Sequence, residues 1–134
     1  MRPENEADLA AMIRAANAPL RIRGGGTRLH PGEDALGLDM RGLTGITLYE
    51  PAALTLVARA GTPLAEIEAV LAAEGQMLGF EPDPRAGSTI GGVAGANASG
   101  GYGSMLRYFK ISASESFLPR FAMGNSIIWV CTKG

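Results

Sequence analysis

The sequence predicts an α+β fold built from two small α/β subdomains, residues 1–80 and residues 81–134. Apolar residues recur at helical spacing in two segments of the first part, and short apolar runs typical of strands stand between them. From Glu81 onward the composition shifts to Pro, Asp, Gly and Ser, which favours a junction there. A chain of 134 residues with 46% hydrophobic content is also large enough to bury a core.

A helix is predicted near the start of the chain. Four apolar residues have the spacing of one helix face: Leu9, Met12, Ile13 and Ala16. Asn5 is the expected N-cap, with Asp8 three residues later in the manner of a capping box. Pro19 ends the helix, because proline cannot continue the hydrogen-bond pattern.

Four short strands and a second helix are expected next. The strands are Leu20–Arg23, Leu36–Asp39, Ile46–Tyr49 and Leu54–Ala58. In the helix, Thr62 is the predicted N-cap and Pro63 the first helical residue, and Gly75 is the predicted stop. Its buried face is expected to hold Leu64, Ile67, Val70 and Leu71.

The second part is predicted to contain one short helix and two strands. Gly92–Asn97 is rich in small residues that can pack closely against a sheet. Phe117–Met123 and Ile127–Thr132 have the composition of strands, and Gly124-Asn125-Ser126 between them favours a hairpin-like turn.

Composition excludes several classes of function. The net charge is −1 and the twelve basic residues are spread along the chain, so no positive stripe for nucleic acid is predicted. With one cysteine, Cys131, and one histidine, His30, neither a disulfide framework nor a metal site is expected, and no catalytic residue is assigned. No signal peptide and no apolar run long enough for a membrane span is present, which predicts a soluble, cytoplasmic chain.

Glycine is the unusual feature, with 19 residues in the chain. Gly24, Gly25 and Gly26 directly follow a predicted strand, where consecutive glycines allow backbone N–H groups to form a concave anion-binding nest. The hydroxyl of Thr27 adds a donor. A phosphate fits such a nest, and a diphosphate fits better if a second donor surface faces it.

The second glycine-rich segment is the candidate for that facing surface. Its candidate residues are Gly87, Ser88, Thr89, Gly91 and Gly92, followed by Asn97, Ser99 and Gly100. Free N–H groups at the start of the short helix are expected to favour an anion. Neither segment matches the GxGxxG or P-loop pattern, so spacing alone leaves a turn or a hinge as the alternative to a nucleotide site.

Several segments together carry a resemblance to a known family. Residues 19–27 resemble the first FAD diphosphate loop of the vanillyl-alcohol-oxidase (PCMH-type) flavoproteins, and residues 87–92 with 97–100 are similar to the second signature of that family. Three intervening segments resemble the FAD subunits of bacterial glycolate oxidases in particular: 49–51, 58–64 and 76–82.

The resemblance implies a PCMH-type FAD-binding domain, with FAD extended between a first subdomain, 1–80, and part of a second, 81–134. Both glycine segments would then bind the diphosphate. It also implies that the flavin accepts hydride from the α-carbon of a small 2-hydroxy acid, which gives the 2-oxo acid. Glycolate is the leading candidate for this substrate. Many relatives attach flavin to a histidine where this chain has Thr27, so non-covalent FAD is expected.

The resemblance weakens after residue 100. Phe109 stands where relatives carry glycine, and neither the rest of the second subdomain nor a substrate-binding cap domain follows before Gly134. We therefore expect an N-terminal fragment that is inactive alone and needs other subunits of an oxidase complex. Alternative substrates are D-lactate, a sugar lactone or an aminosugar nucleotide. The alternative outside enzymes is a non-catalytic nucleotide-binding module. Gly25→Val and Gly91→Val are predicted to abolish nucleotide binding without unfolding the chain.

Overall fold

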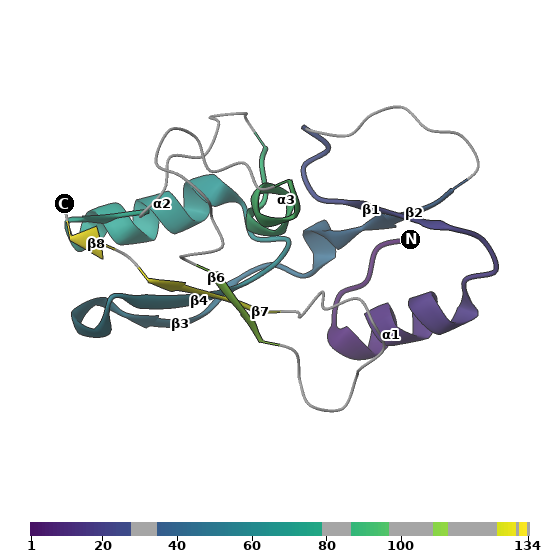
Figure 1. The fold of residues 1–134 in the computed structure, drawn as a ribbon, viewed down its shortest axis with the longest axis horizontal. Helices are drawn as coiled ribbons and strands as arrows, with labels where there is room; N and C mark the ends of the chain where they lie inside the picture. Colours follow the sequence, from purple (N-terminus) through teal and green to yellow (C-terminus); the bar gives the residue numbers. More distant parts are fainter. Residues whose placement is uncertain (28–34, 79–86, 97–108, 113–125, 131, 134) are drawn as a thin grey trace.

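The structure is a computed structural model that describes residues 1–27, 35–78, 87–96, 109–112, 126–130 and 132–133. Its two largest parts are a unit of one helix and two strands near the N-terminus, and a four-stranded sheet with two further helices on one side (Figure 1).

The N-terminal unit consists of helix α1 (Glu6–Ala15) and the parallel strands β1 (Leu20–Arg23) and β2 (Leu36–Asp39). The expected capping is confirmed: the backbone N–H of Asp8 donates to Oδ1 of Asn5 at 2.9 Å, and Nδ2 of Asn5 donates to Oδ2 of Asp8 at 2.8 Å. A small core holds the helix against the strands and the 3-10 turn η1 (Met40–Gly42) that follows; it consists of Leu38, Met40 and Leu43, with Leu9, Met12 and Leu20 packed against them.

The four-stranded sheet is antiparallel and has the order β3-β4-β7-β6. Its strands are β3 (Ile46–Glu50), β4 (Thr55–Arg59), β6 (Phe109–Ser112) and β7 (Ser126–Val130). The 3-10 turn η2 (Pro51–Ala53) joins β3 to β4, and Leu54 after it has φ 52°, which reverses the chain. A separate pair joins β5 (Gln76–Met77) to β8 (Thr132–Lys133).

Helix α2 (Leu64–Ala73) begins one residue later than expected. Pro63 is its N-cap, and no side chain caps the helix there. The hydroxyl of Thr62 instead accepts a hydrogen bond from the backbone N–H of Gly45 at 3.0 Å, so tertiary contact replaces the predicted cap. At the other end the prediction is confirmed, because Gly75 has φ +65° directly after the helix.

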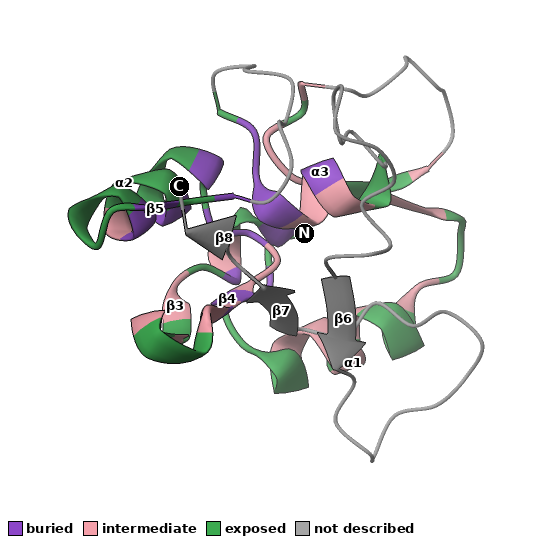
Figure 2. Cartoon of the chain, turned by 60° about the vertical axis from the view of Figure 1, so that its left-hand side comes forward, coloured by how far each residue is buried: buried purple, intermediate pink, exposed green. Residues whose placement is uncertain are grey.

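The main core lies between the sheet and the two helices above it. Helix α3 (Ile90–Gly95) starts two residues before the predicted helix. The buried residues are Leu56, Ala58, Leu64, Ile67, Leu71, Leu78, Ile90 and Val93. Figure 2 shows this buried class on α2, on α3 and on the strand that faces them. The core therefore fixes α3, and the segment that leads into it, against β4.

The C-terminal strands differ from the predicted hairpin. Phe117–Met123 lies outside the described residues, and the predicted strand Ile127–Thr132 is divided between β7 and β8. Strand β7 pairs with both β4 and β6, so strands from both sides of residue 80 share one sheet. The subdomain limits 1–80 and 81–134 stay a prediction.

Candidate functional site

The two glycine-rich segments lie against each other. A β-carbon added to Gly24 would overlap Oγ1 of Thr89, and one added to Gly25 would overlap the carbonyl oxygen of Gly87 and lie 3.3 Å from Cα of Ser88. Residues more than sixty positions apart in the sequence thus share one surface, as the sequence predicted. A side chain at Gly25 would collide with the backbone of the second segment, and one at Gly24 would collide with the buried side chain of Thr89, so glycine is favoured at both positions.

The first segment presents unused backbone donors. Across the described ranges, no hydrogen bond is made by the N–H groups of Gly24, Gly25 or Gly26. Gly26 has φ +74°, a left-handed conformation that turns successive peptide groups toward one side. These residues are half-buried or exposed. Three consecutive N–H groups without a protein acceptor are therefore available to the oxygens of an acceptor-rich ligand.

Hydroxyl groups stand beside these donors. Oγ1 of Thr27 lies 3.2 Å from Oγ of Ser88, which joins the end of the first segment to the second. Ser88 and Thr89 are 4% and 3% exposed, so their side chains are held in place by packing. The combined surface carries backbone N–H groups from the first segment and hydroxyl groups from both, a set of polar groups that suits the oxygens of a phosphate or diphosphate.

The start of α3 differs from the prediction. The backbone N–H groups of its first turn are not free: Ile90 donates to the carbonyl of Thr62, Gly91 to that of Ala60, and Gly92 to Oγ1 of Thr89. The expected anion-binding helix start is therefore wrong, because the core packing of α3 consumes these donors. This segment can contribute the hydroxyls of Ser88 and Thr89, which precede the helix, and a backbone that lies close to the first segment.

The expected effect of the valine substitutions also changes. A β-carbon on Gly91 would lie 2.8 Å from both Cβ and the carbonyl oxygen of Ala60 on the chain just after β4. Together with the overlap at Gly25, this means that valine at either position would first disturb the packing of the chain itself. Loss of binding without loss of stability is no longer expected at Gly25 or Gly91.

The second segment is anchored by backbone hydrogen bonds to the start of α2. The N–H of Leu64 donates to the carbonyl of Ser88 at 2.9 Å, and the N–H of Ile90 donates to the carbonyl of Thr62 at 3.0 Å. These bonds flank an isolated bridge between Pro63 and Thr89. The hydroxyl-bearing residues are thus fixed by the same core that holds the helices.

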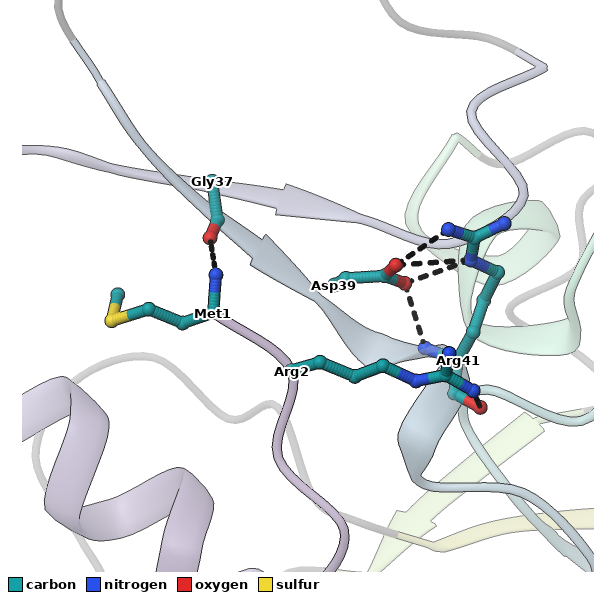
Figure 3. A network of polar contacts seen from close by, with 5 residues as sticks. All are labelled: Met1, Arg2, Gly37, Asp39 and Arg41. Carbon is teal, nitrogen blue, oxygen red and sulfur yellow. Dashed lines mark hydrogen bonds and ion pairs between the residues drawn. The ribbon is translucent and has the colours of Figure 1, made fainter.

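The first segment is anchored through β2. There, the carboxylate of Asp39 accepts hydrogen bonds from the backbone N–H and the guanidinium of Arg41 (Figure 3). The backbone N–H of Asp39 donates to the carbonyl of Met1. The Arg41 guanidinium lowers the pKa of Asp39 to about 2. The terminal ammonium of Met1 donates to the carbonyl of Gly37 at 2.7 Å, so the N-terminal residues run along this strand.

The remaining candidates are not placed. Asn97, Ser99 and Gly100 lie outside the described residues, as do His30 and Cys131. One side chain near the site was not predicted: Arg23, directly before the glycines, lies with its guanidinium over Gly26. Its position at the end of a strand that leads into the glycines is the signal that could have identified it.

Two further findings concern the described part of the chain only. No group of three or more His, Cys, Asp or Glu side chains there is arranged to hold a metal ion. No helix within the same residues is long and apolar enough to cross a membrane.

Known proteins resemble this chain in sequence. Residues 1–109 match the family described as FAD binding domain. Glycolate oxidase subunit GlcE of Escherichia coli (strain K12) is 42% identical over 86 residues, which are 61% of this chain and 24% of that subunit. This chain therefore spans about a quarter of that relative's length.

Solved structures share the fold. Two structures of alkyldihydroxyacetonephosphate synthase, from two crystal forms, superpose with a TM-score of 0.74. The match covers 99% of this chain and 31% of theirs, at 17% and 18% identity. At this identity the likeness concerns the fold alone.

Proposed function

This chain belongs to the FAD binding domain family, and from that premise we propose that its two glycine segments hold the diphosphate of FAD. The predicted α+β, PCMH-type fold is confirmed. The observation that carries the proposal is the row of unpaired N–H groups at Gly24, Gly25 and Gly26, seen within the described residues, beside the hydroxyls of Thr27 and Ser88.

The donor set suits a diphosphate. Such a group carries two negative charges and several acceptor oxygens, and backbone N–H groups directed to one side can bind it without a long side chain. We assign to the site Gly24–Thr27 from the first segment and Gly87, Ser88 and Thr89 from the second, with Gly91 and Gly92 permitting close packing behind them. Asn97, Ser99 and Gly100 are proposed to extend it, as the resemblance implies. The cofactor would lie between the subdomains 1–80 and 81–134.

A series of three ligands tests this proposal. FAD, ADP and riboflavin are titrated into the protein and binding is followed by flavin fluorescence or calorimetry. ADP carries the diphosphate without the flavin, and riboflavin carries the flavin without phosphate. We expect ADP to compete with FAD and riboflavin to bind much more weakly than FAD. Riboflavin binding as tightly as FAD, with no competition by ADP, would contradict the assignment of the glycine segments to the diphosphate.

FAD is proposed to be held non-covalently. Thr27 follows the three glycines, and a threonine hydroxyl does not form the histidyl–flavin bond. Acid precipitation of FAD-loaded protein should therefore release all flavin into the supernatant. Fluorescent flavin remaining in the washed pellet would refute this part and leave the diphosphate site unaffected.

The activity is proposed from the relative named above. When bound, FAD supplies a two-electron acceptor, and the proposed reaction is oxidation of a small 2-hydroxy acid, glycolate first, to the 2-oxo acid. We propose that the chain acts in the cytoplasm with other subunits of an oxidase. The test is anaerobic addition of glycolate, D-lactate or a sugar lactone to the FAD-loaded complex. Bleaching of the flavin absorbance by glycolate alone would support the assignment, and bleaching by another substrate only would replace it.

A further inference from the structure

Arg23 is placed to act on the same ligand. It is the last residue of β1, and its exposed side chain folds back along the glycine segment. A β-carbon on Gly26 would lie 3.2 Å from Nε, 3.7 Å from Cζ and 3.8 Å from Nη2 of Arg23. The guanidinium therefore lies beside Gly26, the last of the three glycines, while the side chain stays exposed to solvent.

The charge of Arg23 is not neutralised by the acidic residue opposite it. In the parallel pair β1–β2, Arg23 stands in register with Asp39. Nε of Arg41 donates to that carboxylate at 2.9 Å and 3.1 Å, and its Nη2 donates at 2.6 Å (Figure 3). Within the described part of the chain, Arg23 itself makes no hydrogen bond or ion pair.

A positive charge beside three unpaired N–H groups forms a complete anion site. The N–H groups of Gly24, Gly25 and Gly26 supply directional donors but no net charge, whereas a diphosphate brings two negative charges. A guanidinium supplies the charge and a planar pair of N–H donors that matches two oxygens of one phosphate. An unpaired arginine held against the loop is what such recognition requires.

We propose that Arg23 binds the diphosphate of the cofactor and gives this loop its preference for a dianionic ligand. The inference rests on the proposed function, since it takes the ligand of the loop to be FAD. It adds a charged side chain to a site otherwise made of backbone N–H groups and hydroxyls. It also assigns a role to the ion pair of Asp39 and Arg41, which keeps the carboxylate of Asp39 away from Arg23.

The test compares three substitutions in FAD and ADP titrations. Arg23→Gln removes the charge and is expected to lower the affinity for FAD and for ADP about tenfold, as for loss of a charged hydrogen bond. Arg23→Lys keeps the charge but loses the planar guanidinium, so its affinity should lie between those of the wild type and Arg23→Gln. Arg59→Gln is the matched control, because it removes one positive charge from a side chain that donates to the carbonyl of Thr44. We expect the control to bind like the wild type.

Salt dependence separates charge recognition from a structural role. Binding of FAD to the wild type and to Arg23→Lys should weaken as salt rises, because screening acts on the exposed charge pair. The dependence should be shallower in Arg23→Gln, and its melting temperature should match that of the control. If Arg23→Gln does not fold, the affinity of Arg23→Lys for FAD still tests the proposal. An affinity equal to that of the wild type would contradict bidentate binding by the guanidinium.

The two proposals fail in different ways. Absence of FAD and ADP binding by the wild type would overturn the proposed function and this inference together. Wild-type binding that Arg23→Gln leaves unchanged, in affinity and in salt dependence, would overturn the role of Arg23 alone.

Discussion

Substitution of Gly25 by alanine tests whether the two glycine segments are packed as the structure shows. The added methyl group would overlap the carbonyl oxygen of Gly87 and lie 3.3 Å from Cα of Ser88. Both obstacles are backbone, so they cannot rotate away as a side chain could. Gly25 does not have a positive φ, so the cost comes from crowding and not from backbone strain. Forced overpacking of this kind costs about 1–3 kcal/mol.

The assay is thermal and urea unfolding followed by circular dichroism. For a chain of this size, about 2 kcal/mol corresponds to a fall in melting temperature on the order of 5–10 °C. Gly37→Ala is the matched control, since no atom lies within 4 Å of a β-carbon built there and its φ is also ordinary. Removing backbone freedom from the unfolded state should leave that variant as stable as the wild type or slightly more stable.

The comparison between the two alanine variants decides the outcome. If Gly25→Ala unfolds at the same temperature and urea concentration as Gly37→Ala, the first segment does not lie against Gly87 and Ser88. The site described above would then lose its second surface. If Gly25→Ala alone is destabilised, the segments touch in solution.

Two further predictions concern stability. The pKa of Asp39 is lowered from 3.8 to about 2 by Arg41, so the ion pair stabilises the fold fully above the ordinary pKa and this contribution is lost as pH falls through about 2. Asp39→Asn should therefore cost about 1 kcal/mol at neutral pH, where the pair is partly exposed, and its urea curve should converge with that of the wild type at acid pH; a gap that persists there would point to a cause other than charge. Ile67 is fully buried between the helices and the sheet. Ile67→Ala should therefore lower the free energy of unfolding, measured in urea, by about 2–5 kcal/mol. A loss below about 1 kcal/mol would contradict the place of Ile67 in the core.

Local patterns in the sequence were sufficient to predict most regular elements. The strands Leu20–Arg23 and Leu36–Asp39 have the predicted limits, and Asn5 caps the first helix as expected. These features depend on residues close in sequence, such as a capping side chain or a short apolar run. The prediction failed at Thr62, where a contact with Gly45 replaces the local cap. Hydrogen bonds between residues distant in sequence, such as this one, cannot be predicted from local helix propensity.

The candidate site shows the same division between local and long-range features. Glycine clusters in the sequence singled out both segments, and the structure places these segments in contact. The sequence could not show that Ile90, Gly91 and Gly92 use their N–H groups for internal hydrogen bonds, because that depends on where β4 and α2 end in space. Nor could it show that the guanidinium of Arg23 lies beside Gly26, or that Arg41 pairs with the carboxylate of Asp39 opposite it.

The most direct test of the central claim is the response of individual backbone amides to ligand. The protein is labelled with ¹⁵N, and amide spectra are recorded during titration with FAD, ADP and riboflavin. The account predicts large downfield shifts of the amide protons of Gly24, Gly25 and Gly26 with FAD and with ADP, as unpaired N–H groups gain phosphate acceptors, and little change there with riboflavin. Saturable FAD binding that leaves these three amides unmoved would contradict the account.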